Sequence, residues 1–117
     1  MAVKAVRGAI QIESNNIKSI EIGVVRLVKL ILDENNILLE NVISIIFSQT
    51  SDLDAMNPAG ALRTIGFEQT PLFCTKEPDI VGSMERIIRV LITVNTEQGL
   101  KPVYLEGAKN LRPDLNN

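Results

Sequence analysis

The chain has 117 residues, 45% of them hydrophobic, and its 12 basic and 14 acidic side chains give a net charge of −2. This balance excludes the strongly basic face of a nucleic-acid binder, and no apolar run reaches the ~20 residues that cross a bilayer. The chain contains no histidine and one cysteine, which excludes hydrolytic triads, His-ligated metal sites and internal disulfides. The first residues lack the apolar region of a signal peptide, so we expect a single cytoplasmic domain spanning residues 1–117.

Hydrophobic periodicity predicts both strands and helices along the chain. Strands are predicted at residues 3–12, 42–49, 70–75, 86–95 and 103–105. Helical spacing predicts a long helix from Ile17 to about Asn35, a short helix at 59–65 with Pro58 in its first turn, and a last helical turn at 106–111. These elements indicate an α+β fold, in which one long and one short helix pack on a mixed sheet of about five strands.

The strand at residues 86–95 carries an arginine in its middle. One face of this strand is wholly apolar and consists of Ile88, Val90, Ile92 and Val94. Arg89 lies on the other face, between Ile87 and Leu91. A guanidinium cannot shed its charge in a protein, so Arg89 should have a carboxylate partner or a bound anion, or extend along its own stem to water. A structural ion pair and a ligand contact both satisfy this requirement.

The helices can cover only one face of the sheet, so the other face needs a cover of its own. Its large apolar residues are expected to be Ile43, Ile45, Phe47, Ile87 and Leu91. Such side chains are not readily left together in water. We therefore expect subunits to associate through this face in a homo-oligomer.

The candidate polar residues are rich in cations and poor in bases. They are Arg7, Arg63, Glu77, Arg89, Tyr104 and Arg112, with Cys74 nearby in the sequence. Arginine offers paired donors to carboxylates at a fixed charge, so this set suits the binding of a small polyanion. Ordinary explanations also exist: ion-paired or solvated arginines, a turn carboxylate, a small buried cysteine and a packed tyrosine. Residue patterns alone thus indicate an anion-binding, oligomeric domain that is an enzyme or a ligand sensor.

Several short motifs follow one another along nearly the whole chain. They are Val6-Arg7-Gly8-Ala9, the run at 48–55, Pro58-Ala59 with Arg63, Cys74-Thr75-Lys76-Glu77, Ile88-Arg89-Val90, Val103-Tyr104-Leu105-Glu106 and Leu111-Arg112-Pro113-Asp114-Leu115. In this order they resemble the small monofunctional chorismate mutases of the trimeric α+β type, and not the all-helical chorismate mutases. The resemblance implies a homotrimer with a pseudo-barrel core and sites between neighbouring subunits. It also implies an isomerase of the shikimate pathway that converts chorismate to prephenate by a pericyclic rearrangement, without metal, cofactor or proton transfer.

The resemblance further implies a role for each residue that would meet the enolpyruvyl side chain of chorismate. Arg89 would donate to the ether oxygen and to the nearby carboxylate, which makes it the main residue acting in the transition state. Arg7 would bind the same carboxylate, assisted by the hydroxyl of Tyr104. In this reaction the protein supplies orientation and positive charge where negative charge grows.

Other residues would meet the ring of the substrate. By similarity, Glu77 and the region of Cys74 would contact the ring hydroxyl, and Arg63 would lie at the mouth of the site near the ring carboxylate. Further substrate contacts are implied at Ala59, Phe73 and Leu111. The tail at 111–115 resembles a segment that closes over the site.

The chain also departs from the family pattern. Family members often carry an aromatic residue and a lysine flanking Pro-Ala, whereas this chain has Asn57 and Gly60, which removes an apolar wall and a cation. The loop at 98–101 is shortened, and Pro78 stands where a flexible residue is usual. Two alternatives stay open: a trimer similar to deaminases of reactive imines, whose arginine motif we do not find, and a non-catalytic trimer that binds a carboxylated metabolite.

Overall fold

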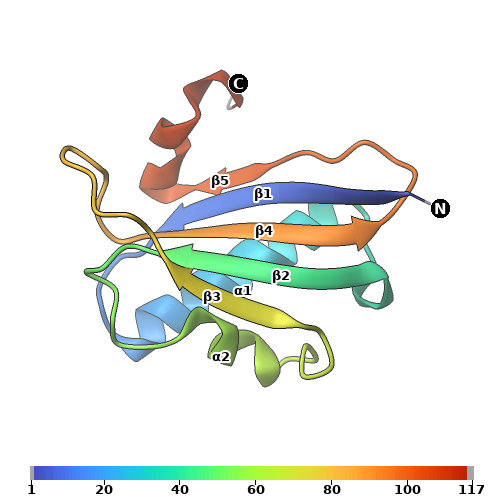
Figure 1. Ribbon diagram of the computed structural model, residues 1–117, viewed down its shortest axis with the longest axis horizontal. Coiled ribbons are helices and arrows are strands. Elements are labelled where there is room, and N and C mark those ends of the chain that lie inside the picture. The colour runs from blue at the N-terminus through green and yellow to red at the C-terminus, as the bar shows by residue number, and fades with distance from the viewer. Residues whose placement is uncertain (1, 116–117) are drawn as a thin grey trace.

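One mixed β-sheet organises the chain (Figure 1). The computed structural model describes residues 2–115, and within them the sheet has five strands in the order β3-β2-β4-β1-β5. The strands are β1 (Val3–Gln11), β2 (Val42–Gln49), β3 (Leu72–Lys76), β4 (Ile87–Asn95) and β5 (Val103–Leu105). The central β4 pairs antiparallel with β1 and β2, while β5 and β3 are added in parallel at the two edges. The α+β fold expected from the sequence is confirmed.

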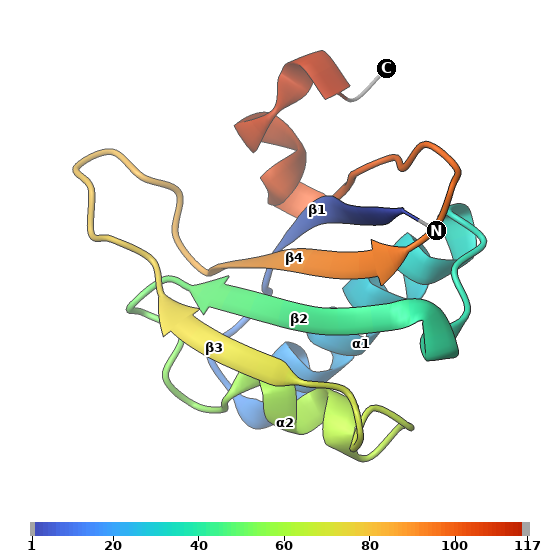
Figure 2. The ribbon, with the colours of Figure 1, turned by 45° about the vertical axis from the view of Figure 1, so that its right-hand side comes forward.

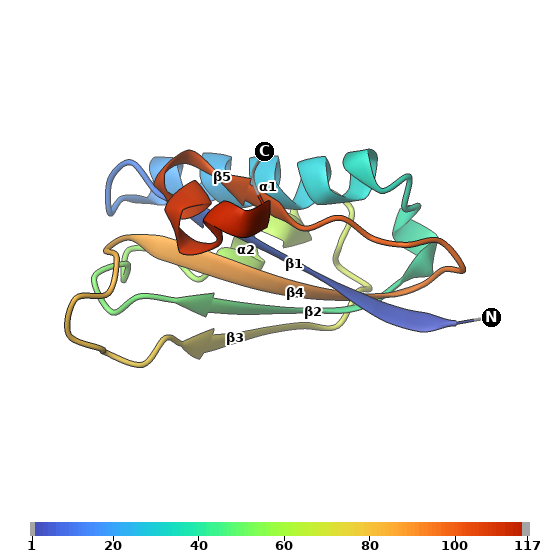
Figure 3. The ribbon, with the colours of Figure 1, turned by 90° about the horizontal axis from the view of Figure 1, so that it is seen from above.

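Two α-helices pack on the same face of the sheet (Figure 3). They are α1 (Ile17–Glu34), which runs along the sheet, and α2 (Pro58–Arg63), which lies under the edge formed by β3 (Figure 2). The side chain of Asn16 accepts the backbone N–H of Ser19 at 2.8 Å and caps the start of α1. Pro58 stands at the first position of α2, where its missing N–H costs nothing.

The main core lies between this helical layer and the sheet. The sequence pattern predicts an apolar stripe on α1 from Ile17 to Ile31. Ile17, in the first turn, is 60% exposed, and the rest of the stripe is fully buried, at Ile20, Val24, Leu27, Val28 and Ile31. The predicted apolar face of β4 is buried as well, at Ile88, Val90, Ile92 and Val94. The prediction for β4 is confirmed and that for α1 is confirmed except at Ile17, and the opposite face of β4 is left available for polar residues.

The prediction for the other face of β2 is partly wrong. Ile45 pairs with Ile92 and Phe47 with Val90, so both point into the main core and are 0% exposed. The cause is a bulge between Val42 and Ser44, which inserts one residue and reverses the alternation of the strand. The large apolar residue on the open face is instead Ile46, which is 41% exposed.

Of the remaining predicted open-face residues, Ile43 and Leu91 are partly exposed and Ile87 is covered. Ile87 packs in a second, small cluster with Ala9, Tyr104 and Ala108. The cover is the C-terminal segment, η2 (Glu106–Leu111) and η3 (Pro113–Leu115), two 3-10 turns that rise beyond β5 (Figure 1). The helical turn expected at 106–111 is therefore present, and residues 116–117 of the expected tail lie outside the described residues.

A buried amide ties the short loop before β5 to the end of α1. Asn35 is 3% exposed, donates from Nδ2 to the carbonyls of Ile31 and Lys101, and accepts the Lys101 N–H at 2.7 Å. Its polar atoms are thereby satisfied, as a buried amide requires. These hydrogen bonds of Asn35 fix where β5, and with it Tyr104, meets β1.

No helix among residues 2–115 is long and apolar enough to cross a membrane.

Gly8 lies where β1 meets both α1 and β5. An added Cβ would stand 2.6 Å from Ile31 Cδ1 and 2.9 Å from the backbone oxygen of Val103, which cannot rotate away. We predict that Gly8→Ala lowers the free energy of unfolding by about 1 to 3 kcal/mol, as overpacked cores do. Urea denaturation measures this loss. Gly99→Ala is the matched control, because open space surrounds that position, and a loss equal to that of the control would contradict the packing at Gly8.

Candidate active site

The mid-strand arginine has a carboxylate partner. Arg89 Nε lies 3.0 Å from Glu77 Oε1, and the hydroxyl of Ser48, which pairs with Arg89 across the sheet, donates to the same oxygen. Glu77 is brought there because its backbone N–H donates to the Gln49 carbonyl at 2.8 Å, directly after β3. The ion pair foreseen as one explanation of Arg89 is thus present. It uses Nε and leaves Nη1 and Nη2 without a partner among the described residues.

Arg7 and Tyr104 lie on the same face of the sheet as Arg89. Arg7 pairs in register with Leu91, and Tyr104 with Ala9, which itself pairs with Arg89. Arg7, Arg89 and Tyr104 line one hollow of about 250 Å³. We call Arg7, Glu77, Arg89 and Tyr104 the sheet-face cluster.

Leu111 reaches this cluster from the C-terminal segment. It lines a smaller hollow of about 120 Å³ together with Glu77, Arg89 and Ile87. Arg112 in the next turn holds Asp114 through two contacts of 3.1 and 2.9 Å. The pKa of the Asp114 carboxyl is lowered, mainly by the hydrogen bond from Arg112 and to a small extent by the charge of Arg7. The last turns therefore lie beside the sheet-face cluster, while Arg112 itself is engaged with Asp114.

Three other predicted residues lie around the edge strand β3 and the helix beneath it. Cys74 pairs with Phe47, so its side chain points to the helical side of the sheet, where its Sγ lies 2.8 Å from Asn57 Oδ1. Ala59 is buried in the first turn of α2, and Arg63 is exposed at the last. We call Asn57, Ala59, Arg63 and Cys74 the edge cluster.

The two clusters are on opposite faces of the sheet. Phe73, next to Cys74 on β3, points to the open face beside Ile46 and is 66% exposed. One chain therefore brings Arg7, Glu77, Arg89 and Tyr104 together, and it does not bring the edge cluster to them.

The environment of Cys74 keeps its thiol protonated. Burial raises its pKa, and the backbone N–H of Ala59 and the positive charge of Arg63 offset only part of that rise. A thiol of this kind is a weak nucleophile at neutral pH.

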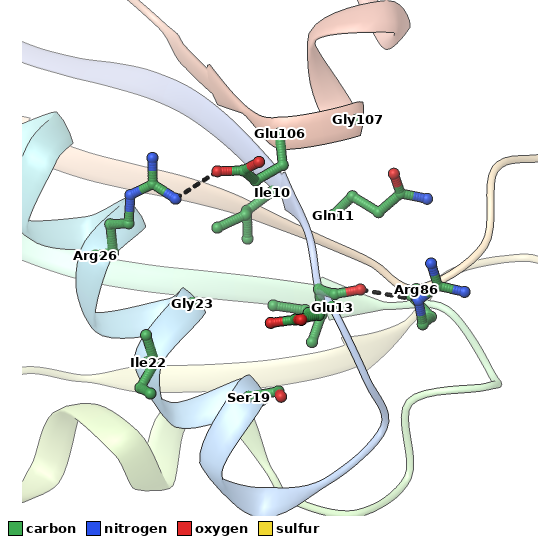
Figure 4. Close-up of a pocket in the computed structure, with 11 residues that line it drawn as sticks. Ile10, Gln11, Glu13, Ser19, Ile22, Gly23, Arg26, Arg86, Glu106 and Gly107 are labelled. Atoms are coloured by element: carbon green, nitrogen blue, oxygen red, sulfur yellow. Dashed lines mark hydrogen bonds and ion pairs between the residues drawn. The ribbon is translucent and has the colours of Figure 1, made fainter.

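A larger cavity lies on the helical side, away from every predicted site residue. It has a volume of about 470 Å³ between α1 and the end of β1 (Figure 4). Its two guanidinium groups already have partners: Arg26 lies 2.7 Å from Glu106, and Arg86 Nε donates to the Ile12 carbonyl at 2.9 Å. Both guanidinium groups are thus engaged within the protein, so the sheet-face cluster is the better candidate for an active site.

Two residues that contact predicted site residues, Ser48 and Asn57, were not singled out as site residues from the sequence. Ser48 had a signal, because it ends the polar side of its predicted strand. Asn57 was noted only as a departure from the family pattern. No group of three or more metal-ligating side chains occurs within residues 2–115.

Comparisons with known proteins agree on one family. The profile of chorismate mutase type I matches residues 3–115. The chain belongs to the chorismate mutase type I family. Chorismate mutase AroH of Bacillus subtilis (strain 168) is 35% identical over 120 residues, which cover 99% of this chain and 94% of that protein. Chorismate mutase AroH of Thermus thermophilus is 37% identical over 119 residues, 98% of each chain.

A solved structure agrees with the same family and with the fold. The chorismate mutase from Clostridium thermocellum has a TM-score of 0.89 and 41% sequence identity, and the match covers 92% of this chain and 98% of that one. Membership of the chorismate mutase type I family confirms the resemblance carried by the ordered motifs. In the sheet-face cluster, two arginines share a hollow with Tyr104, and the carboxylate of Glu77 is already paired with Arg89.

The protonated state of Cys74 can be tested directly. Because burial raises its pKa above the ordinary value of 9.0, the folded chain carries less thiolate at mildly alkaline pH than the unfolded chain. We predict slower alkylation by iodoacetamide in the native protein than in urea, with the midpoint of the native pH profile displaced upward. A native midpoint at or below the unfolded one would contradict the burial of this thiol.

Proposed function

We propose that this protein catalyses the rearrangement of chorismate to prephenate, as an isomerase of aromatic amino-acid biosynthesis. One observation carries the proposal: Arg89 is held at Nε by Glu77, while its remaining donors share a hollow with Arg7 and Tyr104. Family membership supports the same activity. The reaction breaks a carbon–oxygen bond and forms a carbon–carbon bond within one molecule, so it needs neither cofactor nor general base.

In this mechanism Arg89 stabilises the negative charge that grows on the ether oxygen. A fixed guanidinium needs no reorganisation when the charge develops, which is the condition for lowering the barrier. Arg7 and the Tyr104 hydroxyl bind the carboxylate of the enolpyruvyl side chain and hold the compact reactive conformer. Glu77 keeps Arg89 in place and accepts from the ring hydroxyl, and Leu111 excludes water from one side.

The site is completed by residues that this chain does not bring to its own sheet-face cluster. We infer that the ring of chorismate is bound by Ala59, Arg63, Phe73 and Cys74 of a neighbouring subunit in a homotrimer. The separation of the sheet-face and edge clusters supports this arrangement. The exposed apolar residues Ile46 and Leu91 on the open face support it too, since association buries them. Sedimentation of the purified protein measures the mass of the assembly.

We also place the protein in the cytoplasm. Its single cysteine is a free thiol among the described residues, which fits a reducing compartment.

The activity itself is tested by mixing the purified protein with chorismate and following the loss of its ultraviolet absorbance. Turnover above the spontaneous rate is expected, and absence of it contradicts the proposal. Tight binding of a bicyclic dicarboxylate mimic of the transition state without turnover would point to a regulatory binder instead.

Replacing the central arginine tests the mechanism. Arg89→Gln removes the charge and leaves a side chain of related shape, so we predict that kcat falls by about a hundredfold to a thousandfold, as expected when a transition-state donor is lost. Circular dichroism and sedimentation should show an unchanged fold and assembly. Near-normal turnover of Arg89→Gln would contradict the role of Arg89.

A further inference from the structure

The contacts of Asn57 fix the orientation of its side-chain amide. Oδ1 accepts the backbone N–H of Ala59 at 2.9 Å and the thiol of Cys74 at 2.8 Å. Exchanging the oxygen and the nitrogen of the amide would set an N–H donor against the N–H of Ala59 and would lose the bond that the oxygen accepts from the thiol. Nδ2 is therefore turned away from Ala59 and Cys74.

The amide nitrogen is left free to bind something else. Asn57 is exposed, and Nδ2 has no hydrogen-bond partner within residues 2–115. The cap of α2 uses only the oxygen of this side chain, so the nitrogen is not needed for the cap. Two N–H donors are thus presented at the edge cluster.

The neighbours of Asn57 indicate which ligand group these donors suit. Arg63 lies on the same short helix, near enough for its charge to act on Cys74. Gly60 contributes no cation. The position has room for a side chain, because an added Cβ would meet only Met56 Cε, at 3.6 Å. The edge cluster therefore combines one positive charge with one pair of neutral donors, which together suit a carboxylate.

We propose that Asn57 binds the ring carboxylate of the substrate through Nδ2, and that the N–H of Ala59 and the thiol of Cys74 together hold the amide in the orientation this requires. The inference rests on the proposed function, because it takes chorismate as the ligand. Asn57 then supplies a neutral donor in a chain that lacks the lysine often found beside Pro-Ala in the family. Such a contact exists before and during the reaction, so its loss should raise KM more than it lowers kcat.

The variant Asn57→Asp tests the donor role with little change of shape. Asp is as good a helix cap as Asn and still offers an oxygen to Ala59 and Cys74, but it faces the ring carboxylate with a negative charge. We expect KM for chorismate to rise by about tenfold or more and kcat to change by less than about twofold. Asn57→Ser, which keeps a capping oxygen without the amide nitrogen, should raise KM by about threefold to tenfold.

Asn41→Asp is the matched control for the added charge, because Asn41 is an exposed residue before β2 and belongs to neither cluster. Its KM should equal that of the parent protein. The dissociation constant of the bicyclic dicarboxylate mimic, measured by calorimetry, should follow the same order among the variants. This second measurement needs no turnover, so it decides the role of Asn57 even if the catalytic proposal fails.

The contact between Asn57 and Cys74 can be tested by a separate measurement. A carboxylate at position 57 should raise the pKa of the Cys74 thiol, and alkylation at neutral pH should be slower in Asn57→Asp than in the parent protein. The other charged groups around this thiol are unchanged by the substitution: Arg63 on α2, and Asp54 and Lys76, which line the same hollow.

Two results would overturn the inference. One is a KM and a mimic affinity for Asn57→Asp within about twofold of those of the parent protein. The other is a loss of kcat that tracks a lower melting temperature with KM unchanged, which would assign Asn57 a structural role alone.

Discussion

The contact between Arg89 and Glu77 is the constraint on which the candidate site depends. A permanent charge in the central strand must be compensated, and Glu77 does so at Nε from a turn that directly follows the edge strand β3. Arg89 remains 45% exposed while Glu77 is 19% exposed, so the pair is open to a ligand on the arginine side. The ion pair and the catalytic role, which look like competing explanations of Arg89, are compatible because they use different nitrogens of one guanidinium.

The strand order and register of the sheet place the other residues of the candidate site around this contact. Because β4 is central, its apolar face anchors the core under α1, and its other face carries Arg89 between β2 and β1. The register of strand pairing places Arg7 and Tyr104 on that same face. The hydrogen bonds of Asn35 fix the position of β5, the strand that carries Tyr104. The edge strand and α2 carry the second cluster on the opposite side. A substrate with two carboxylates needs both clusters, which is the physical reason for proposing that neighbouring subunits share each site.

Predictions from the sequence were correct where apolar residues recur at a regular spacing along a whole strand or helix. The buried face of β4 and the stripe of α1 follow from spacing, and the position of Arg89 follows with them. Sequence reasoning failed at β2, because a one-residue bulge has no clear signal in the run Val-Ile-Ser-Ile-Ile-Phe and reverses the face of Ile45 and Phe47. It also could not foresee the contact between Asn57 and Cys74, which joins residues from a helix cap and a strand through tertiary packing. The family resemblance named the candidate site residues, but only the folded chain separates them into two clusters.

The most direct test of this account is complementation between two damaged subunits. Arg89→Gln disables the sheet-face cluster, and Arg63→Glu disables the edge cluster by repelling the substrate. When equal amounts are unfolded and refolded together, random cyclic trimers contain intact pairs of clusters in about a quarter of their sites. The account predicts that the mixture regains chorismate turnover toward about a quarter of the parent activity. Activity no greater than the sum of the two variants, in verified mixed trimers, would contradict a site shared between subunits.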